Sequence, residues 1–289
     1  MAAIAMVLVA TIALGSSTYA WFAANTTVTA STMKVQAVAE NGIEIKEHSA
    51  GEADYASSDA AKVETAMNLY PTSTYDGSTW VHAVAKASGK AAAIAGSYTE
   101  PALTSGANSQ MYDAAGKQYY RVDQFDIRTV KGTTVDQKIG VSKVTVTGTP
   151  DALNKSLRVL VVGEDGSVIY NAGGGDTSRV VCATVNTDGN PATKATVTYT
   201  AADTKSGRIA TCVKGTNAAA GAAQTVNIYL YYEGEDSNHF SNNYSSTLAE
   251  LNVTVEFESD DTLGDITPIT ATAASTDEAA GKAVLNPTT

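Results

Sequence analysis

Hydrophobic and polar residues alternate with a period of two along much of this chain. Between Val226 and Tyr232, and again between Leu251 and Phe257, every second residue is apolar. Successive side chains of a strand point to opposite faces, so each segment predicts a strand with one buried face. Further segments that predict strands lie at 33–38, 43–46, 119–127, 141–147, 157–162, 167–170, 180–185, 195–200 and 208–213.

Turn residues separate several of these segments. Asn41-Gly42 follows the first segment, and a hairpin is expected there because both residue types tolerate a positive φ angle. Gly163-Glu164-Asp165-Gly166 predicts a second hairpin, between 157–162 and 167–170. Within 119–127 the apolar alternation changes phase, which predicts a bulge near Asp123-Gln124.

Residues 50–118 are less regular. Val63, Met67 and Tyr70 would share one face of a helix, so a helix is expected over 59–69, before Pro71. Residues 83–95 are rich in Ala and predict a weak helix or a loop, and 96–118 predict a surface loop.

These patterns together predict an all-β fold. The expected architecture is a jelly-roll or immunoglobulin-like β-sandwich over residues 31–258, with short helices in loops. Residues 259–289 form an acidic, then Ala- and Thr-rich tail, which is either frayed or adds an edge strand through 266–272. The composition agrees, because 14 Tyr accompany only 4 Phe and 2 Trp, as in thin sheets joined by polar turns.

The first 24 residues differ from the rest of the chain. Residues 1–14 are apolar except for one Thr, and the small-residue stretch Ser17-Thr18-Tyr19-Ala20 follows soon after. This order is typical of an export signal and its cleavage zone, so we expect a secreted protein at or beyond the cell surface. Such signals ordinarily begin with Lys or Arg, whereas the first basic residue here is Lys34. Residues 1–20 are therefore an export signal that is removed, or a hydrophobic helix that is retained.

The charge balance argues against two classes of partner. The formal net charge is −11 at pH 7, and the isoelectric point is near 4.7. An acidic surface repels nucleic acid and anionic lipid, so membrane contact is expected only through residues 1–24 if they are retained. The chain also contains no His-Glu-x-x-His, Gly-x-Ser-x-Gly, phosphate-loop or dinucleotide motif. We therefore expect neither enzyme activity nor an organic cofactor.

The two cysteines, Cys182 and Cys212, both lie in predicted strands. An exported chain with an even number of cysteines predicts a disulfide between them. The alternative is a pair of buried free thiols.

One acidic loop is a candidate metal site. Residues 233–239, Glu-Gly-Glu-Asp-Ser-Asn-His, hold three carboxylates and an imidazole. Oxygen ligands from Glu233, Glu235 and Asp236 would suit calcium, and a solvated loop at a strand end is the alternative. A metal-dependent hydrolase that uses these residues with His239 is a further hypothesis.

Two stretches carry a family resemblance. Residues 15–22, Gly-Ser-Ser-Thr-Tyr-Ala-Trp-Phe, followed by 30–35, Ala-Ser-Thr-Met-Lys-Val, resemble the start of the TasA/camelysin group of exported Gram-positive proteins. Residues 228–236 are similar to the penultimate strand and loop of uncharacterised Firmicutes proteins with that type of signal. The resemblance implies a jelly-roll subunit of biofilm fibres whose freed N-terminal segment adds as a strand to the neighbouring subunit. The metalloprotease activity ascribed to camelysin is not carried over, because the zinc motif is missing.

The segment that would start the mature chain supports polymerisation independently. Residues 21–30, WFAANTTVTA, carry no charge, and 25–30 are β-prone and free of Pro and Gly. Such an end can complete the open sheet of another subunit through backbone hydrogen bonds. The expected subunit contacts are Trp21, Phe22, Asn25, Thr26, Thr27, Val28 and Thr29. The alternative is that the segment folds back as an edge strand of its own domain.

The sequence thus predicts a self-assembling structural subunit of an extracellular fibre or pilus, a homopolymer joined head to tail. One alternative is a pilus-like filament that keeps the N-terminal helix in its core. Another is a monomeric surface adhesin or carbohydrate-binding module, because exposed Tyr side chains stack on sugars.

Overall fold

The computed structural model describes residues 28–39, 42–61, 64–85, 91–96, 109–112, 118–148, 155–186, 190–237 and 251–279. Apart from the 3-10 turn η1 (Glu52–Asp54) and the four-residue helix α2 (Thr276–Ala279), every element in these ranges is a strand. The predicted all-β class is confirmed. No helix in the described ranges has the length and hydropathy needed to cross a membrane, and residues 1–24 lie outside them.

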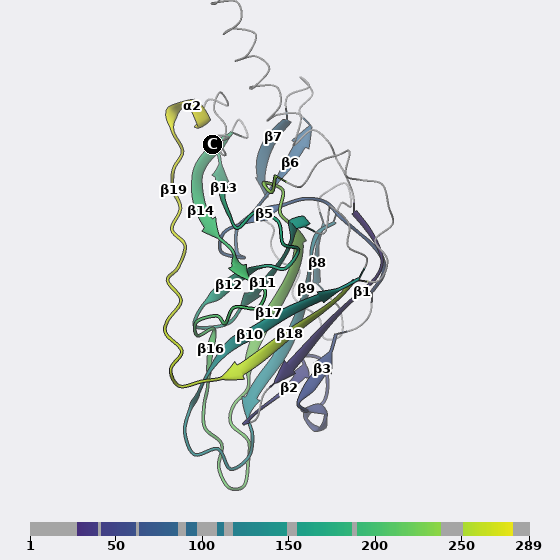
Figure 1. Cartoon of the computed structure of the whole chain (residues 1–289), viewed down its shortest axis with the longest axis vertical. Coiled ribbons are helices and arrows are strands. Elements are labelled where there is room, and N and C mark those ends of the chain that lie inside the picture. Colours follow the sequence, from purple (N-terminus) through teal and green to yellow (C-terminus); the bar gives the residue numbers. More distant parts are fainter. Residues whose placement is uncertain are drawn as a thin grey trace, which may run out of the picture.

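Thirteen strands form one sheet that closes around the main core (Figure 1). Its path runs through β15 (Thr200–Ala201), β12 (Ser167–Asn171), β11 (Leu157–Val162), β17 (Gln224–Tyr232), β9 (Gln118–Thr129), β4 (Glu64–Leu69), β1 (Val28–Ala39), β18 (Leu251–Ser259), β10 (Gln137–Thr147) and β16 (Ala210–Cys212). Three more strands join from the side: β2 (Ile43–Glu47) and β8 (Ser109–Tyr112) pair with β9, and β3 (Ser58–Ala60) pairs with β1. The two ends of the path come together, since Val144 of β10, the strand next to β16, donates its N–H to the carbonyl of Ala202, the residue after β15, at 2.8 Å. The result is a β-sandwich-like body.

The main core consists of the inward faces of these strands. The residues that β17 and β18 contribute are Val226, Ile228, Leu230, Tyr232, Leu251, Val253, Val255 and Phe257. Burial of one large apolar side chain stabilises the fold by about 1.5–3 kcal/mol, which explains why the alternating pattern determines the inward face. These are the apolar faces that the sequence pattern predicts. The expectation of a single buried face is wrong for β17, because Tyr229 and Tyr231 on its opposite face are buried as well.

A second layer covers the outer face of β9, β11, β12 and β17. It comprises two three-stranded sheets, one of β13 (Ser178–Val185), β14 (Pro191–Thr198) and β19 (Thr272–Ala273), the other of β5 (Ser73–Thr74), β6 (Trp80–Ala85) and β7 (Ala91–Gly96). A second core lies between this layer and the main sheet. Its buried members are Trp80, Tyr119, Tyr120, Val122, Leu160, Ile169, Val181, Ala183, Ala195, Val197, Tyr199, Tyr229 and Tyr231.

The second core explains the change of phase in β9. The pairing of β9 with β17 runs without a shift of register from Tyr120 to Ile127, so the bulge predicted at Asp123-Gln124 is wrong. Tyr120 and Val122 face the second core, whereas Phe125 and Ile127 face the main core. Because both faces of β9 are buried, the alternation of apolar residues along it does not identify one buried face.

The helix predicted over 59–69 is also wrong. Residues 58–60 and 64–69 are the strands β3 and β4, and both pair antiparallel with β1. Residues 80–85 and 91–96, predicted in part as a weak helix or loop, form the antiparallel pair β6–β7. Short segments have little helical preference of their own, so pairing with a neighbouring strand decides their conformation.

The two predicted hairpins have different outcomes. β11 and β12 form the expected hairpin, with Val162 opposite Ser167 across the turn. Gly42 has the expected positive φ of 97°, but the strands on either side of it do not pair with each other. β1 pairs with β18, and β2 pairs with β9. The connection that contains Gly42 therefore carries the chain from one part of the sheet to another, and Asn41 lies outside the described residues.

The C-terminal strap, residues 260–276, connects the two layers. It leaves β18, runs extended along one side of the molecule and reaches α2 beside the second layer (Figure 1). Ile266 packs against the main core, and Ile269 and Ala271 pack against the second core. Of the predicted edge strand over 266–272, only Thr272 belongs to a strand, β19, at the edge of β14.

Candidate functional site

The predicted subunit contacts lie mostly outside the described residues. Trp21, Phe22, Asn25, Thr26 and Thr27 fall there. Val28 and Thr29 begin β1 and pair with Leu69 and Asn68 of β4 in the same chain. This end of the predicted donor segment thus belongs to its own sheet, and a donor role remains a prediction for residues 21–27.

The predicted disulfide is not formed. Cys182 lies on β13 in a small cluster with Val81, whereas Cys212 lies on β16 in the main core. Both thiols are free and buried, and each donates to a backbone carbonyl, that of Thr184 and that of Ile127 respectively. Burial raises the pKa of each thiol to about 12, and in Cys182 the charge of Glu235 adds to this effect. The strand pattern placed both residues in strands but did not reveal that the strands belong to different layers.

The acidic loop directly follows β17 and is held by backbone contacts. Glu233 donates its N–H to the carbonyl of Ser156 at 2.8 Å, and Gly234 donates to Thr72 at 2.9 Å. The Glu233 side chain is fully buried and accepts hydrogen bonds from Ser73 Oγ, from Tyr199 Oη at 3.0 Å and from the N–H of Glu235 at 2.9 Å. Glu233 therefore joins β17 to β5 and to the end of β14.

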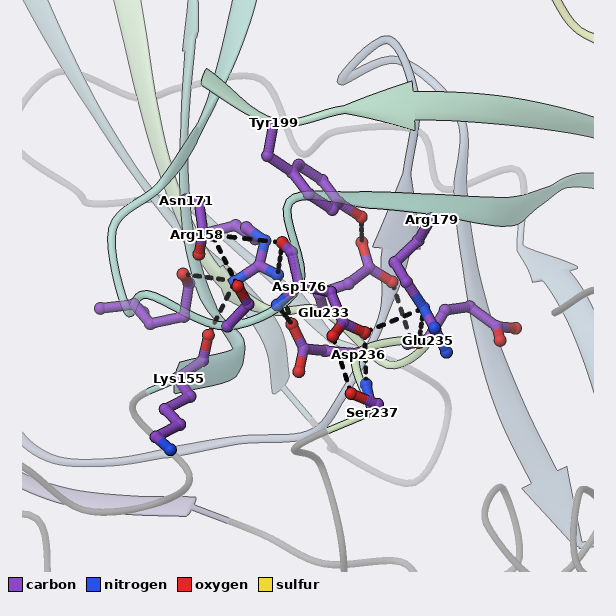
Figure 2. A network of polar contacts seen from close by, with 12 residues as sticks. Lys155, Arg158, Asn171, Asp176, Arg179, Tyr199, Glu233, Glu235, Asp236 and Ser237 are labelled. Atoms are coloured by element: carbon purple, nitrogen blue, oxygen red, sulfur yellow. Dashed lines mark hydrogen bonds and ion pairs between the residues drawn. The ribbon is translucent and has the colours of Figure 1, made fainter. Parts of the chain in front are cut away.

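Asp236 forms a fully buried ion pair with Arg158 of β11 (Figure 2). One carboxylate oxygen, Oδ2, accepts from Arg158 Nη2 and from the N–H of Asp176 at 2.9 Å. The guanidinium also donates to the carbonyls of Lys155, Leu157 and Asp176 at 2.9–3.1 Å. Its Cζ lies 4.3 Å from the centre of the Tyr199 ring, within the range of a cation–π contact.

Asp176 and Arg179 extend this network to the second layer. Asp176 accepts from the N–H of Ser237 at 2.8 Å and from its Oγ at 2.7 Å, and it pairs with Arg179 Nε at 3.2 Å. Arg179, on β13, also donates to the carbonyl of Glu235. We call Arg158, Asp176, Arg179, Glu233 and Asp236 the Arg158 cluster. Its members come from three separate parts of the chain, which are β11, the start of β13 with the loop before it, and the loop after β17 (Figure 2).

Glycine is required where this cluster meets the β12–β13 loop. A Cβ atom on Gly175 would lie 2.3 Å from the carbonyl oxygen of Lys155 and 2.4 Å from Asp236 Oδ2. Gly175 is therefore packed directly against the ion pair, whereas Gly174 of the same loop has open space where a Cβ would lie.

The carboxylates of the candidate metal site do not converge on one point. In the part of the chain that the structure describes, no group of three or more His, Cys, Asp or Glu side chains is arranged to hold a metal ion. Glu233 accepts from Ser73 and Asp236 accepts from Arg158, and His239 lies outside the described residues. The arrangement supports a structural role for the loop in joining the two layers, and calcium binding there stays a prediction.

Glu233 is expected to make stability depend on pH. Burial raises the pKa of its carboxyl above the ordinary value of 4.5, against the hydrogen bonds that lower it. As pH rises past 4.5 the unfolded chain loses this proton before the folded chain does, so the contribution of Glu233 to stability falls. Glu233→Gln should therefore gain stability relative to the unaltered protein between pH 4 and pH 7, measured by urea unfolding. Glu164→Gln, at an exposed turn, is the control, and an equal pH profile for both variants would refute the expectation.

A second polar cluster was not predicted from the sequence. Lys46 of β2 lies opposite Asp126 of β9 and is only 4 % exposed. Its Nζ donates to Asp126 at 3.1 Å and to the carbonyls of His48 and Ala50. Asp126 also contacts His48 Nδ1 and Thr225 Oγ1, each at 2.8 Å. Burial would raise the pKa of Asp126, but these three side-chain hydrogen bonds outweigh it and lower that pKa. The alternation in β2 puts Lys46 on the polar face of the strand. Only the structure shows that the loop after β2 covers this face.

Comparison of the chain with protein-family models, with curated proteins and with solved structures gives no match.

Proposed function

We propose that this protein is a self-assembling structural subunit of an extracellular fibre or pilus, of the kind found in a biofilm matrix. Its body is a jelly-roll or immunoglobulin-like sandwich. Copies of the chain join head to tail through residues 21–27, which add as a strand to the next copy. The chain reaches the cell exterior through the export signal predicted in residues 1–20.

The position of β1 carries this proposal. β1 runs parallel to β18 over residues 33–39 and antiparallel to β4 over residues 28–33. Over Val28–Thr32, the described strands pair with the β4 side of β1 alone. Residues 21–27 therefore precede a strand whose first part has one open side among the described elements. An uncharged segment in this place is suited to strand addition.

The sugar-binding alternative has less support among the described residues, where Tyr55, Tyr70 and Tyr75 are only partly exposed. It depended on exposed tyrosines, but half of the 14 Tyr side chains are buried. These are Tyr119, Tyr120, Tyr170, Tyr199, Tyr229, Tyr231 and Tyr232. Tyr55, which is partly exposed, lies under the guanidinium of Arg128, with 3.5 Å between Cζ and the ring centre.

Deletion of residues 21–27 from the mature protein is expected to abolish filaments and leave a folded monomer, as judged by electron microscopy and sedimentation. Thr27→Pro should weaken assembly because proline removes a backbone donor, whereas Thr27→Ser, the matched control, should assemble normally. Unaltered filaments from the deletion variant would rule out strand donation. N-terminal sequencing of secreted material tests the retained-helix alternative, which requires residues 1–20 to be present.

A further inference from the structure

The second layer contains a long strand edge that is only partly covered. β14 has eight residues and pairs with β13 along its whole length on one side. On its other side, the described pairing is with β19, at Thr193 and Lys194 only. A strand edge with unpaired N–H and C=O groups is a template for another strand. The strap-side edge of β14 is therefore a candidate site for strand addition.

The strap over this edge is held loosely. The first part of the strap is anchored, because Leu263 is buried above Gly140 and Asp265 pairs with Arg208 at 2.8 Å. From Thr267 to Thr276 no side chain is buried, and β19 has only two residues. Segments with few buried contacts open at the lowest free energy. Beyond the strap, Asn186 Nδ2 donates to the carbonyl of Ala279 in α2 at 2.9 Å. The second part of the strap can thus leave the edge while Asp265 on one side and α2 on the other stay in place.

We propose that the strap-side edge of β14 accepts residues 21–27 of a second copy, which displace strap residues 267–276. This inference rests on the proposed fibre function and identifies the strand edge that would receive the donated segment. The strap segment, TPITATAAST, and the donor region 21–30, WFAANTTVTA, are both uncharged and dominated by Thr and Ala. An edge that binds the first segment within one chain is therefore chemically suited to the second.

The apolar contacts of the strap favour this exchange. Ile269 and Ala271 rest against the second core, which is rich in aromatic side chains. Their departure uncovers apolar surface of that core beside β14. Trp21 and Phe22 of the incoming segment would bury a larger area there than Ile269 and Ala271 do, and aromatic rings pair favourably with the tyrosines. In this proposal the strap covers the edge of β14 until residues 21–27 of a second copy displace it.

A disulfide between strap and edge tests the exchange. Thr193 and Ala273 are opposite each other, and the bond from the Ala274 N–H to the carbonyl of Ala192 makes them a non-hydrogen-bonded pair. Cα atoms in such pairs are about 4.5 Å apart, within the range that a disulfide spans. In the double variant Thr193→Cys with Ala273→Cys, peptide mapping first verifies the bridge. Filament formation is then compared in oxidised and reduced protein, with Ala273→Cys alone as the control.

The oxidised double variant is expected to lose filament formation, and reduction should restore it. A fluorescent peptide of residues 21–30 should bind the reduced form and not the oxidised form. Filaments that form equally well from both forms would overturn the β14 acceptor while leaving the fibre function intact. Absence of filaments from the unaltered mature protein as well would overturn the fibre function and, with it, this inference.

Discussion

Asp236→Asn is expected to lower the free energy of unfolding by about 3–5 kcal/mol, because it leaves a buried guanidinium without its carboxylate. Arg158 and Asp236 are both 0 % exposed in their side chains, so water cannot replace the lost partner. Asp236 also accepts the N–H of Asp176, and the substitution weakens this contact between the β12–β13 loop and β17. Urea unfolding at pH 7 followed by circular dichroism measures the change.

The matched control is Asp265→Asn, which makes the same chemical change in an exposed ion pair. Asp265 pairs with Arg208 at 2.8 Å, but its side chain is 78 % exposed. Such pairs contribute about 0–1 kcal/mol, so this variant should unfold almost like the unaltered protein. Addition of Arg158→Met to Asp236→Asn should recover part of the loss, because no unpaired charge remains buried. Equal losses in Asp236→Asn and Asp265→Asn would refute a structural role for the Arg158 cluster.

Trp80→Ala is expected to destabilise the protein by about 3–5 kcal/mol, the usual cost of removing a large buried aromatic side chain. Trp80 of β6 is 3 % exposed, and its ring centre lies 4.4 Å from that of Tyr120 and 5.1 Å from that of Tyr231. Its Nε1 also donates to the carbonyl of Gly77 at 3.0 Å. The substitution would leave a cavity where the second layer meets the main sheet. Chemical unfolding measures the loss, and near-ultraviolet circular dichroism reports on the tyrosines around the cavity.

Two control variants separate the loss of packing around Trp80 from a general sensitivity of the protein's stability to substitution. Trp80→Phe keeps an aromatic ring in the second core and should cost less than Trp80→Ala. Val135→Ala shortens a side chain that is 52 % exposed, and such surface changes stay within about 0.5 kcal/mol. A loss below about 1 kcal/mol for Trp80→Ala would show that the second layer does not depend on this contact for its attachment to the sandwich.

The candidate site was predictable in its composition but not in its contacts. Glu233, Glu235 and Asp236 stand out in the sequence as acidic residues after a strand, and this suggested a metal site. Their partners come from distant strands and loops, so nothing near them in the sequence shows that Arg158 and Ser73 will bind them. The sequence provides one signal in retrospect. Arg158 lies within an otherwise apolar strand, Leu157–Val162, where a charged residue requires a buried partner.

The sequence by itself determined the all-β class, the β11–β12 hairpin and the inward faces of β17 and β18. These features depend on side-chain alternation and turn chemistry, which are local properties of the chain. Only the tertiary structure decided that β9 serves two cores, that residues 64–69 form a strand, and that Cys182 and Cys212 lie in different layers. Each of these depends on which distant segment covers a face or an edge. Alternation separates the two faces of a strand, but it carries no information about the segment that packs against each of them.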